Sequence, residues 1–225
     1  MDRRHFAWTL AAATSAWPLA GRAAALSETD AAAGVRAALE RGAVAAVAFL
    51  GRSDGFLGNP QVRIPLPGAL DDAAGMLRAA GQGKRLDELV TAMNRAAEAA
   101  VPEARTLLVS AAQSISVEDA LKIVRGGDTS VTDFFARKTR EPLGLKFLPI
   151  VTRATEKVKL ADRYNAVAGK AMGFGLVRKE DANVQQYVTA KTLDGLYFMI
   201  GEEEKKIRAD PVGTGSAILR KVFSL

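Results

Sequence analysis

The side chains best suited to chemistry in this sequence are carboxylates, cations and amides on two predicted helices. Asn94, Arg95 and Glu98 lie within one helical turn among alanines, and Asn94 and Glu98 are i,i+4 neighbours on one helix face. Lys191 and Asp194 stand three residues apart on a later helix. Groups of these types can hold an anion or transfer a proton. The structural alternative is a hydrogen-bonded strut between two close helices, because buried polar groups are normally paired.

A binding site built from these groups would depend on its cations. Arg95 and Lys191, joined by Arg63 from an irregular loop, would receive a small anionic ligand. If Lys191 and Asp194 point inward, they would instead form a buried ion pair with Arg95 and Glu98. The same groups could also serve an enzyme that uses carboxylate, Lys and Arg chemistry. The predicted ligand-binding residues are Arg63, Asn94, Arg95, Glu98, Lys191 and Asp194.

Several catalytic classes lack a necessary residue in this chain. It contains no cysteine, and its only histidine, His5, lies in a segment that we expect to be removed. Thiol nucleophiles, Ser-His relays and the usual zinc sites therefore each miss a partner. We predict no catalytic residue, no metal site and no cofactor, and we favour a protein that is not an enzyme.

The first 25 residues have the layout of an export signal. Arg3 and Arg4 precede a modestly apolar stretch, residues 7–19, and Ala23–Ala25 supplies the small residues that a signal peptidase accepts. The RRHF string resembles a twin-arginine signal, and the alternative is a general secretory signal with the same layout. We predict cleavage after Ala25, a periplasmic location and one mature domain over residues 26–225.

Composition sets the broad class of the mature protein. The chain has 225 residues, of which 48% are hydrophobic and 25% are charged, as in ordinary globular proteins. Removing three basic residues and one acidic residue with the signal lowers the formal net charge from +6 to +4. This small, dispersed charge argues against nucleic acid as a partner. No apolar run reaches the roughly 18 residues of a membrane-spanning helix, so we predict no membrane span.

One long predicted helix organises the rest of the chain. Between Asn183 and Asp210, apolar residues recur near a spacing of 3.6 and form a stripe too wide to leave in water. Asn183 has the side chain of an N-cap, and Asp210 precedes a proline, which disfavours further helix. The stripe contains Tyr187, Val188, Leu193, Leu196, Tyr197, Ile200 and Ile207. Residues 202–208, three acids followed mostly by basic residues, should form a solvated face.

The remaining pattern is helical except for one loop. We predict an all-α, single compact domain of about ten short to medium helices with one long irregular loop, Gly51–Pro67. Glycines and prolines punctuate this loop, yet its apolar residues should anchor it to the body. We expect separate helices over residues 67–80, from Pro142 onward and after Pro211. The loop is either a working surface that includes Phe56 and Asn59, or a structural strap over a helix pair.

Five strings in the sequence resemble one exported bacterial family, the domain of unknown function 4197. They are GFLGNPQVRIPLP, MNRAAEAAVPEA, GGDTSVTDFF, KFLPIV and YVTAKTLDGLYFMIGEEEKKIRADPVG, and the likeness runs from about Leu26 to Phe223. The resemblance implies a periplasmic envelope protein and brings no activity, cofactor or catalytic residue. Our leading hypothesis is a non-enzymatic helical binding or interaction protein whose partner is a small anionic ligand or an envelope protein. A structural envelope protein is a further alternative.

Overall fold

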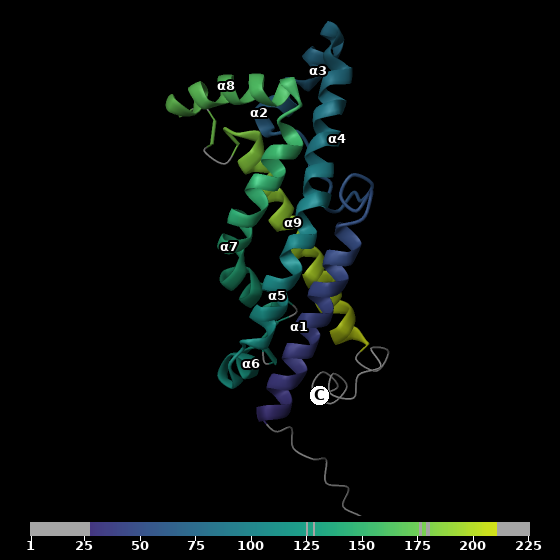
Figure 1. Cartoon of the computed structure of the whole chain (residues 1–225), viewed down its shortest axis with the longest axis vertical. Coiled ribbons are helices and arrows are strands. Elements are labelled where there is room, and N and C mark those ends of the chain that lie inside the picture. Colours follow the sequence, from purple (N-terminus) through teal and green to yellow (C-terminus); the bar gives the residue numbers. More distant parts are fainter. Residues whose placement is uncertain (1–27, 125, 128, 176, 179–180, 211–225) are drawn as a thin grey trace, which may run out of the picture.

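The computed structural model describes residues 28–210 except 125, 128, 176, 179 and 180, and every regular element in them is a helix (Figure 1). The all-α prediction is confirmed, but seven helices have eight residues or more, instead of about ten. The α-helices are α1 (Glu28–Leu50), α2 (Gly68–Asp72), α3 (Ala74–Leu77), α4 (Gly83–Ala100), α5 (Ala104–Gln113), α6 (Val117–Val124), α7 (Ser130–Thr155), α8 (Lys159–Gly173) and α9 (Val184–Ala209).

Helix α9 is the centre of the domain, as the sequence predicts. Its N-cap is Asn183, whose Oδ1 accepts a hydrogen bond from the Gln186 amide at 3.0 Å. All seven residues of the predicted apolar stripe are buried. Helices α1, α4 and α7 contact α9 along the long axis of the molecule, whereas α8 crosses its end (Figure 1). The fold therefore places its most continuous apolar surface in the middle.

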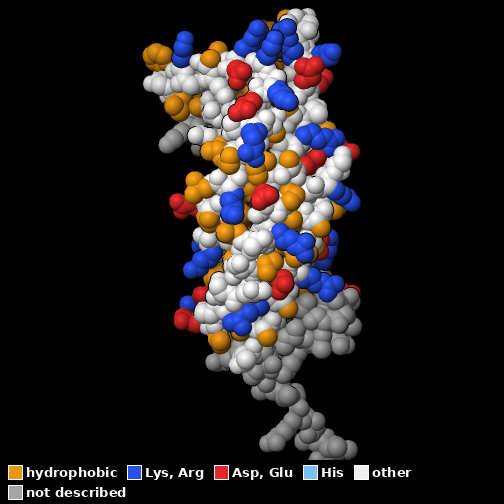
Figure 2. Space-filling view, in the orientation of Figure 1, with side chains coloured by type: hydrophobic (Ala, Val, Ile, Leu, Met, Phe, Trp, Pro, Cys, Tyr) orange, Lys and Arg blue, Asp and Glu red, His pale blue; other side chains and the backbone are white. Residues whose placement is uncertain are grey.

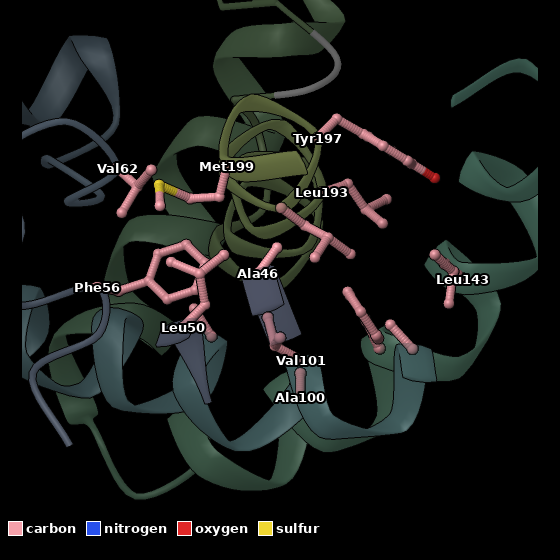
Figure 3. Close-up of a cluster of buried hydrophobic side chains, with 14 of the residues drawn as sticks. Ala46, Leu50, Phe56, Val62, Ala100, Val101, Leu143, Leu193, Tyr197 and Met199 are labelled. Atoms are coloured by element: carbon pink, nitrogen blue, oxygen red, sulfur yellow. The ribbon is translucent and has the colours of Figure 1, made fainter. Parts of the chain in front are cut away.

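The core around α9 combines small residues with large side chains. Ala46 of α1 and Ala100 of α4 are fully buried and let their helices approach closely. Figure 3 shows the Phe56 ring beside Leu50 and Met199, and Leu193 on the side of α9 that faces Leu143. Core side chains are packed at crystal-like density, so each such position is sensitive to a change of volume.

Helix α7 corrects the prediction of a helix beginning at Pro142. Both Pro142 and Pro149 lie inside one helix of 26 residues. An internal proline removes a backbone hydrogen bond and costs about 3 kcal/mol. Phe135, Leu143 and Phe147 on the same helix are completely buried, and burying each contributes about 1.5 to 3 kcal/mol. Packing against α4 and α9 therefore outweighs the cost of the prolines.

The segment predicted as one helix over residues 67–80 is broken into short pieces. Helices α2 and α3 are followed by a π-helical stretch, Arg78–Gln82, in which Gly81 has φ of 75°. This left-handed conformation favours glycine and ends the helix there. The expected helix stop at Gly81 is therefore present, but the helix before it is not continuous.

The solvated face predicted over residues 202–208 contains one buried acid. Glu204 is only 4% exposed, and its Oε2 accepts hydrogen bonds from the amide and hydroxyl of Thr132 at 3.1 and 2.9 Å. Arg208 pairs with the other carboxylate oxygen. Glu202 and Glu203 pair with Lys205 and Lys206 at the surface. The charge run thus joins α9 to the start of α7.

Two predicted segments, the signal at residues 1–25 and the helix after Pro211, lie outside the described residues. None of the helices in the described ranges is long and apolar enough to span a bilayer.

Candidate functional site

The loop Gly51–Pro67 folds as two turns followed by an extended stretch. The Gly55 and Gly58 amides donate to the carbonyls of Arg52 and Asp54 at 3.0 and 3.2 Å. A Cβ atom at Gly55 would come within 2.4 Å of the Leu50 carbonyl oxygen, so glycine is required there. The Asn59 carbonyl then accepts from the Arg63 amide at 2.9 Å. The turns bring the loop back over the end of α1.

Asn94 of α4 pairs with the extended part of the loop as a strand partner would. Its Oδ1 accepts from the Ile64 amide at 2.9 Å, and its Nδ2 donates to the Ile64 carbonyl at 2.9 Å. Nδ2 also donates to the Val90 carbonyl. Asn94 is completely buried, and these bonds satisfy both ends of its amide.

Glu98, one turn later on α4, holds the first turn of the loop. Its Oε1 accepts from the amides of Phe56 and Leu57 at 3.0 and 3.1 Å. Its Oε2 accepts from Arg95 at 2.7 Å, and Arg95 also pairs with Asp54 at 2.8 Å. These hydrogen bonds to Glu98 and Asp54 raise the pKa of Arg95. These contacts join a loop to one helix, whereas the strut alternative expected a link between two helices. A ligand role for these three residues stays a prediction.

The extended stretch alternates between the core and solvent. Val62, Ile64 and Leu66 are buried, whereas Arg63 and Pro65 are exposed. The hydroxyl of Tyr187 on α9 donates to the carbonyls of Pro65 and Leu66 at 3.2 and 3.4 Å. Helices α4 and α9 therefore hold this stretch from two sides, and Arg63 projects from a fixed backbone.

Burial raises the pKa of the Tyr187 hydroxyl to about 12, and it also raises the pKa values of Tyr164 and Tyr197. An exposed tyrosine has a pKa near 10. Because the folded state favours the neutral form, stability should be unaffected by these groups below pH of about 10 and should fall as the pH rises toward 12. Ultraviolet titration should show tyrosinate forming near pH 10 in urea and at higher pH in the native protein. Identical native and unfolded titration curves would contradict this prediction.

The two residues expected on the loop surface differ in exposure. Phe56 is fully buried, so its predicted surface position is wrong. Its ring lies against α9, where a Cβ atom on Gly195 would be 2.8 Å from Phe56 Cε1. Asn59 is partly exposed, and its Oδ1 accepts from the Gln61 amide at 3.1 Å. Phe56 anchors the loop, and Asn59 shapes its second turn.

A shallow groove of about 390 Å³ separates the extended stretch from α9. Three of the six predicted ligand-binding residues, Arg63, Lys191 and Asp194, line it. The exposed ring of Phe198, 40% accessible, lies on the same lining. The full lining consists of Gln61, Val62, Arg63, Ile64, Pro65, Lys191, Asp194, Gly195 and Phe198.

Lys191 and Asp194 are not buried as an inward ion pair. Their side chains are 45% and 50% exposed, and their charged atoms are 3.9 Å apart. Asp194 instead binds Arg140 of α7 at 2.7 Å, and the Arg140 guanidinium lies 5.3 Å from the centre of the Tyr197 ring. Arg140 thus binds one oxygen of the Asp194 carboxylate closely, and the longer contact of Lys191 with the other oxygen makes Lys191 the more weakly paired cation.

The predicted residues fall into two clusters. Asn94, Arg95 and Glu98 lie beneath the loop and bind it, whereas the other three line the groove. The four groups of the enzyme alternative therefore do not meet at one point. Sequence reasoning missed Arg140 and Phe198, although Phe198 could have been found as an aromatic residue off the apolar stripe of α9. Within the described ranges, no group of three His, Cys, Asp or Glu side chains could hold a metal ion.

Comparison with known protein families places the chain in a family of unknown function. Residues 25–224 match the family described as "Protein of unknown function (DUF4197)". This match covers nearly the whole chain. No curated protein and no solved structure matches the chain.

Proposed function

We propose a binding function for this chain, which belongs to the DUF4197 family. The protein is a non-enzymatic, exported binding protein that captures a small anionic ligand in the groove between the 51–67 loop and α9. Export is inferred from the twin-arginine-like segment at residues 1–25. In support, the family match begins at residue 25, where we expect cleavage. The location that we infer is the periplasm.

One observation carries the binding proposal. Arg63 and Lys191 reach the same groove from different elements, and neither makes a hydrogen bond within the described part of the chain. In the groove, Arg140 donates to Oδ1 of Asp194 at 2.7 Å, and Lys191 Nζ lies 3.9 Å from Oδ2 of the same carboxylate. A guanidinium and an ammonium group together suit a carboxylate or phosphate, with the guanidinium able to bind two oxygens.

The rest of the groove indicates the shape of the ligand. Its volume of about 390 Å³ is within the range of small-molecule sites. Phe198 and the exposed side of Pro65 supply an apolar surface beside the two cations. The proposed ligand therefore carries an anionic group next to a ring or short hydrocarbon. The backbone bonds to Asn94, Glu98 and Tyr187 hold this surface in place, so little order is lost on binding.

Calorimetry with phenyl phosphate tests the proposal. Each of the variants Arg63→Ala and Lys191→Ala should weaken phenyl phosphate binding at least roughly tenfold, because a hydrogen bond to a charged group contributes about 1.5 to 3 kcal/mol. Both side chains are exposed, so the melting temperature should stay unchanged.

Matched controls are Arg105→Ala on α5 and Lys146→Ala on α7, which remove exposed cations outside the groove. Equal losses of affinity in the controls and the groove variants would mean that only net charge matters, and would overturn the proposal. Native purification from periplasm followed by mass spectrometry would identify the natural ligand. A co-purifying protein with no small molecule would favour an adaptor instead.

A further inference from the structure

Two further grooves, which adjoin each other, lie at the end of the molecule where α8 crosses the bundle (Figure 1). One groove, of about 420 Å³, lies between α2, α3 and α8; it is lined by Ala69, Leu70, Ala73, Leu77, Leu160, Arg163, Tyr164, Val167, Ala168 and Val177. The other, also about 420 Å³, is lined by Leu77, Gln82, Arg85, Leu86, Lys159, Leu160 and Arg163. The two grooves share Leu77, Leu160 and Arg163, so they meet along one wall.

The groove between α2, α3 and α8, which we call the apolar groove, is lined almost entirely by apolar atoms. Leu70, Tyr164 and Ala168 are buried and form its floor. The Tyr164 hydroxyl donates to the Asp181 carbonyl at 2.7 Å, which satisfies its polar atom within the protein. Val167 on the rim is 69% exposed, although large apolar side chains are usually covered. Arg163 is the one charged residue in this lining.

The second, the basic groove, carries three cations and no acid in its lining. Arg85 donates to Gln82 Oε1 at 2.6 Å, whereas Lys159 and Arg163 make no hydrogen bond or ion pair with any described residue. Glu88 lines an adjoining groove with Arg85 and Lys159, and the exposed Asp162 is the sequence neighbour of Arg163 on α8. Figure 2 shows Lys and Arg side chains at this end, with acidic side chains among them and hydrophobic ones beside them near α8.

We infer that the two grooves form one binding site for a single-chain anionic amphiphile. The hydrocarbon chain lies in the apolar groove, and the anionic head binds Arg163, Lys159 and Arg85 in the basic groove. Charge complementarity selects this ligand: a neutral apolar chain would leave the cations without a counterpart, and a free anion would leave the apolar groove empty. This site shares no residue with the groove beside the 51–67 loop, so it is independent of the proposed function.

Calorimetry with dodecyl phosphate, kept below its micelle concentration, tests the inference on the full chain. Dodecyl phosphate should bind at one site, and octyl phosphate should bind at least roughly tenfold more weakly, because each buried methylene contributes roughly fourfold in affinity. Dodecyltrimethylammonium, which has the same chain and the opposite charge, should bind at least roughly tenfold more weakly than dodecyl phosphate.

Two variants locate the site. Arg163→Gln should weaken dodecyl phosphate binding at least roughly tenfold, and Ala73→Leu should weaken it by filling the apolar groove. Lys146→Gln on α7 removes an exposed cation elsewhere and should leave binding unchanged. The inference would be overturned by equal affinity for the two head groups, by an Arg163→Gln variant that binds normally, or by binding only to anionic lipid vesicles and not to the monomeric amphiphile.

Discussion

Replacing Glu98 with alanine should lower the free energy of unfolding by about 3 to 5 kcal/mol, because two backbone amides would lose their acceptor. Glu98 Oε1 accepts hydrogen bonds from the amides of Phe56 and Leu57, and the Glu98 side chain is only 6% exposed. In the described part of the chain, no other side chain accepts a hydrogen bond from these amides. Urea unfolding followed by circular dichroism measures the change.

Glu88→Ala is the matched control, since Glu88 is an exposed glutamate on the same helix and should change stability by less than about 0.5 kcal/mol. Glu98→Gln should fall between the two variants. It keeps one carbonyl oxygen for the amides but turns an NH2 group toward Arg95, which donates to the other oxygen at 2.7 Å. If Glu98→Ala is as stable as Glu88→Ala, the Glu98 carboxylate does not stabilise the loop, which is then held by Asn94, Tyr187 and its apolar contacts.

The Glu98→Ala variant also distinguishes the stability of the loop from its binding of the ligand. Arg63 is carried by a stretch that Asn94 and Tyr187 hold independently of Glu98. At a urea concentration where Glu98→Ala is still folded, phenyl phosphate binding should therefore weaken less than in Arg63→Ala. This difference distinguishes a group that contacts the ligand from one that positions the loop.

Periodicity and capping were enough to predict the central helix. The apolar stripe of α9 and the Asn183 cap are local signals, and packing agrees with both. Local signals failed where a distant contact decides the outcome. Pro142 is tolerated because neighbouring helices cover α7, and Glu204 is buried because Thr132, 72 residues earlier, supplies its donors. Neither the helices that cover α7 nor the Thr132 donors of Glu204 can be identified from residue spacing along one helix.

The sequence predicted which residue types form the candidate site, but not how those residues are arranged in space. The sequence grouped Asn94, Arg95 and Glu98 correctly, because one helical turn fixes their proximity. It could not show that Arg63 and Lys191 face one groove, since their elements meet only through the fold of the loop. The surface position predicted for Phe56 was wrong for a related reason. An aromatic residue in a glycine-rich loop has no periodicity that indicates whether its side chain is buried or exposed.

Phe56 and Gly195 should show strong coupling in a double-mutant cycle. Phe56→Ala removes a fully buried ring and should cost about 3 to 5 kcal/mol. Gly195→Ala places a methyl group 2.8 Å from Phe56 Cε1 and 3.3 Å from Val62 Cβ, which forces the ring or the loop to shift. The single Gly195→Ala variant should therefore lose about 1 to 2 kcal/mol, after the helix preference of alanine is included.

In the Phe56→Ala background, the effect of Gly195→Ala should change sign. The ring that clashed most closely with the methyl group is gone, and only the 3.3 Å contact with Val62 Cβ remains. Alanine favours an α-helix over glycine by about 1 kcal/mol. The double variant should therefore be more stable than Phe56→Ala alone, by up to about 1 kcal/mol. Gly201→Ala, elsewhere on α9, is the matched control, because its Cβ would meet only Thr132 at 3.5 Å. It should have the same effect in both backgrounds. If Gly195→Ala also behaves identically in both, the Phe56 ring does not lie on α9, and the backbone that carries Arg63 is not anchored there.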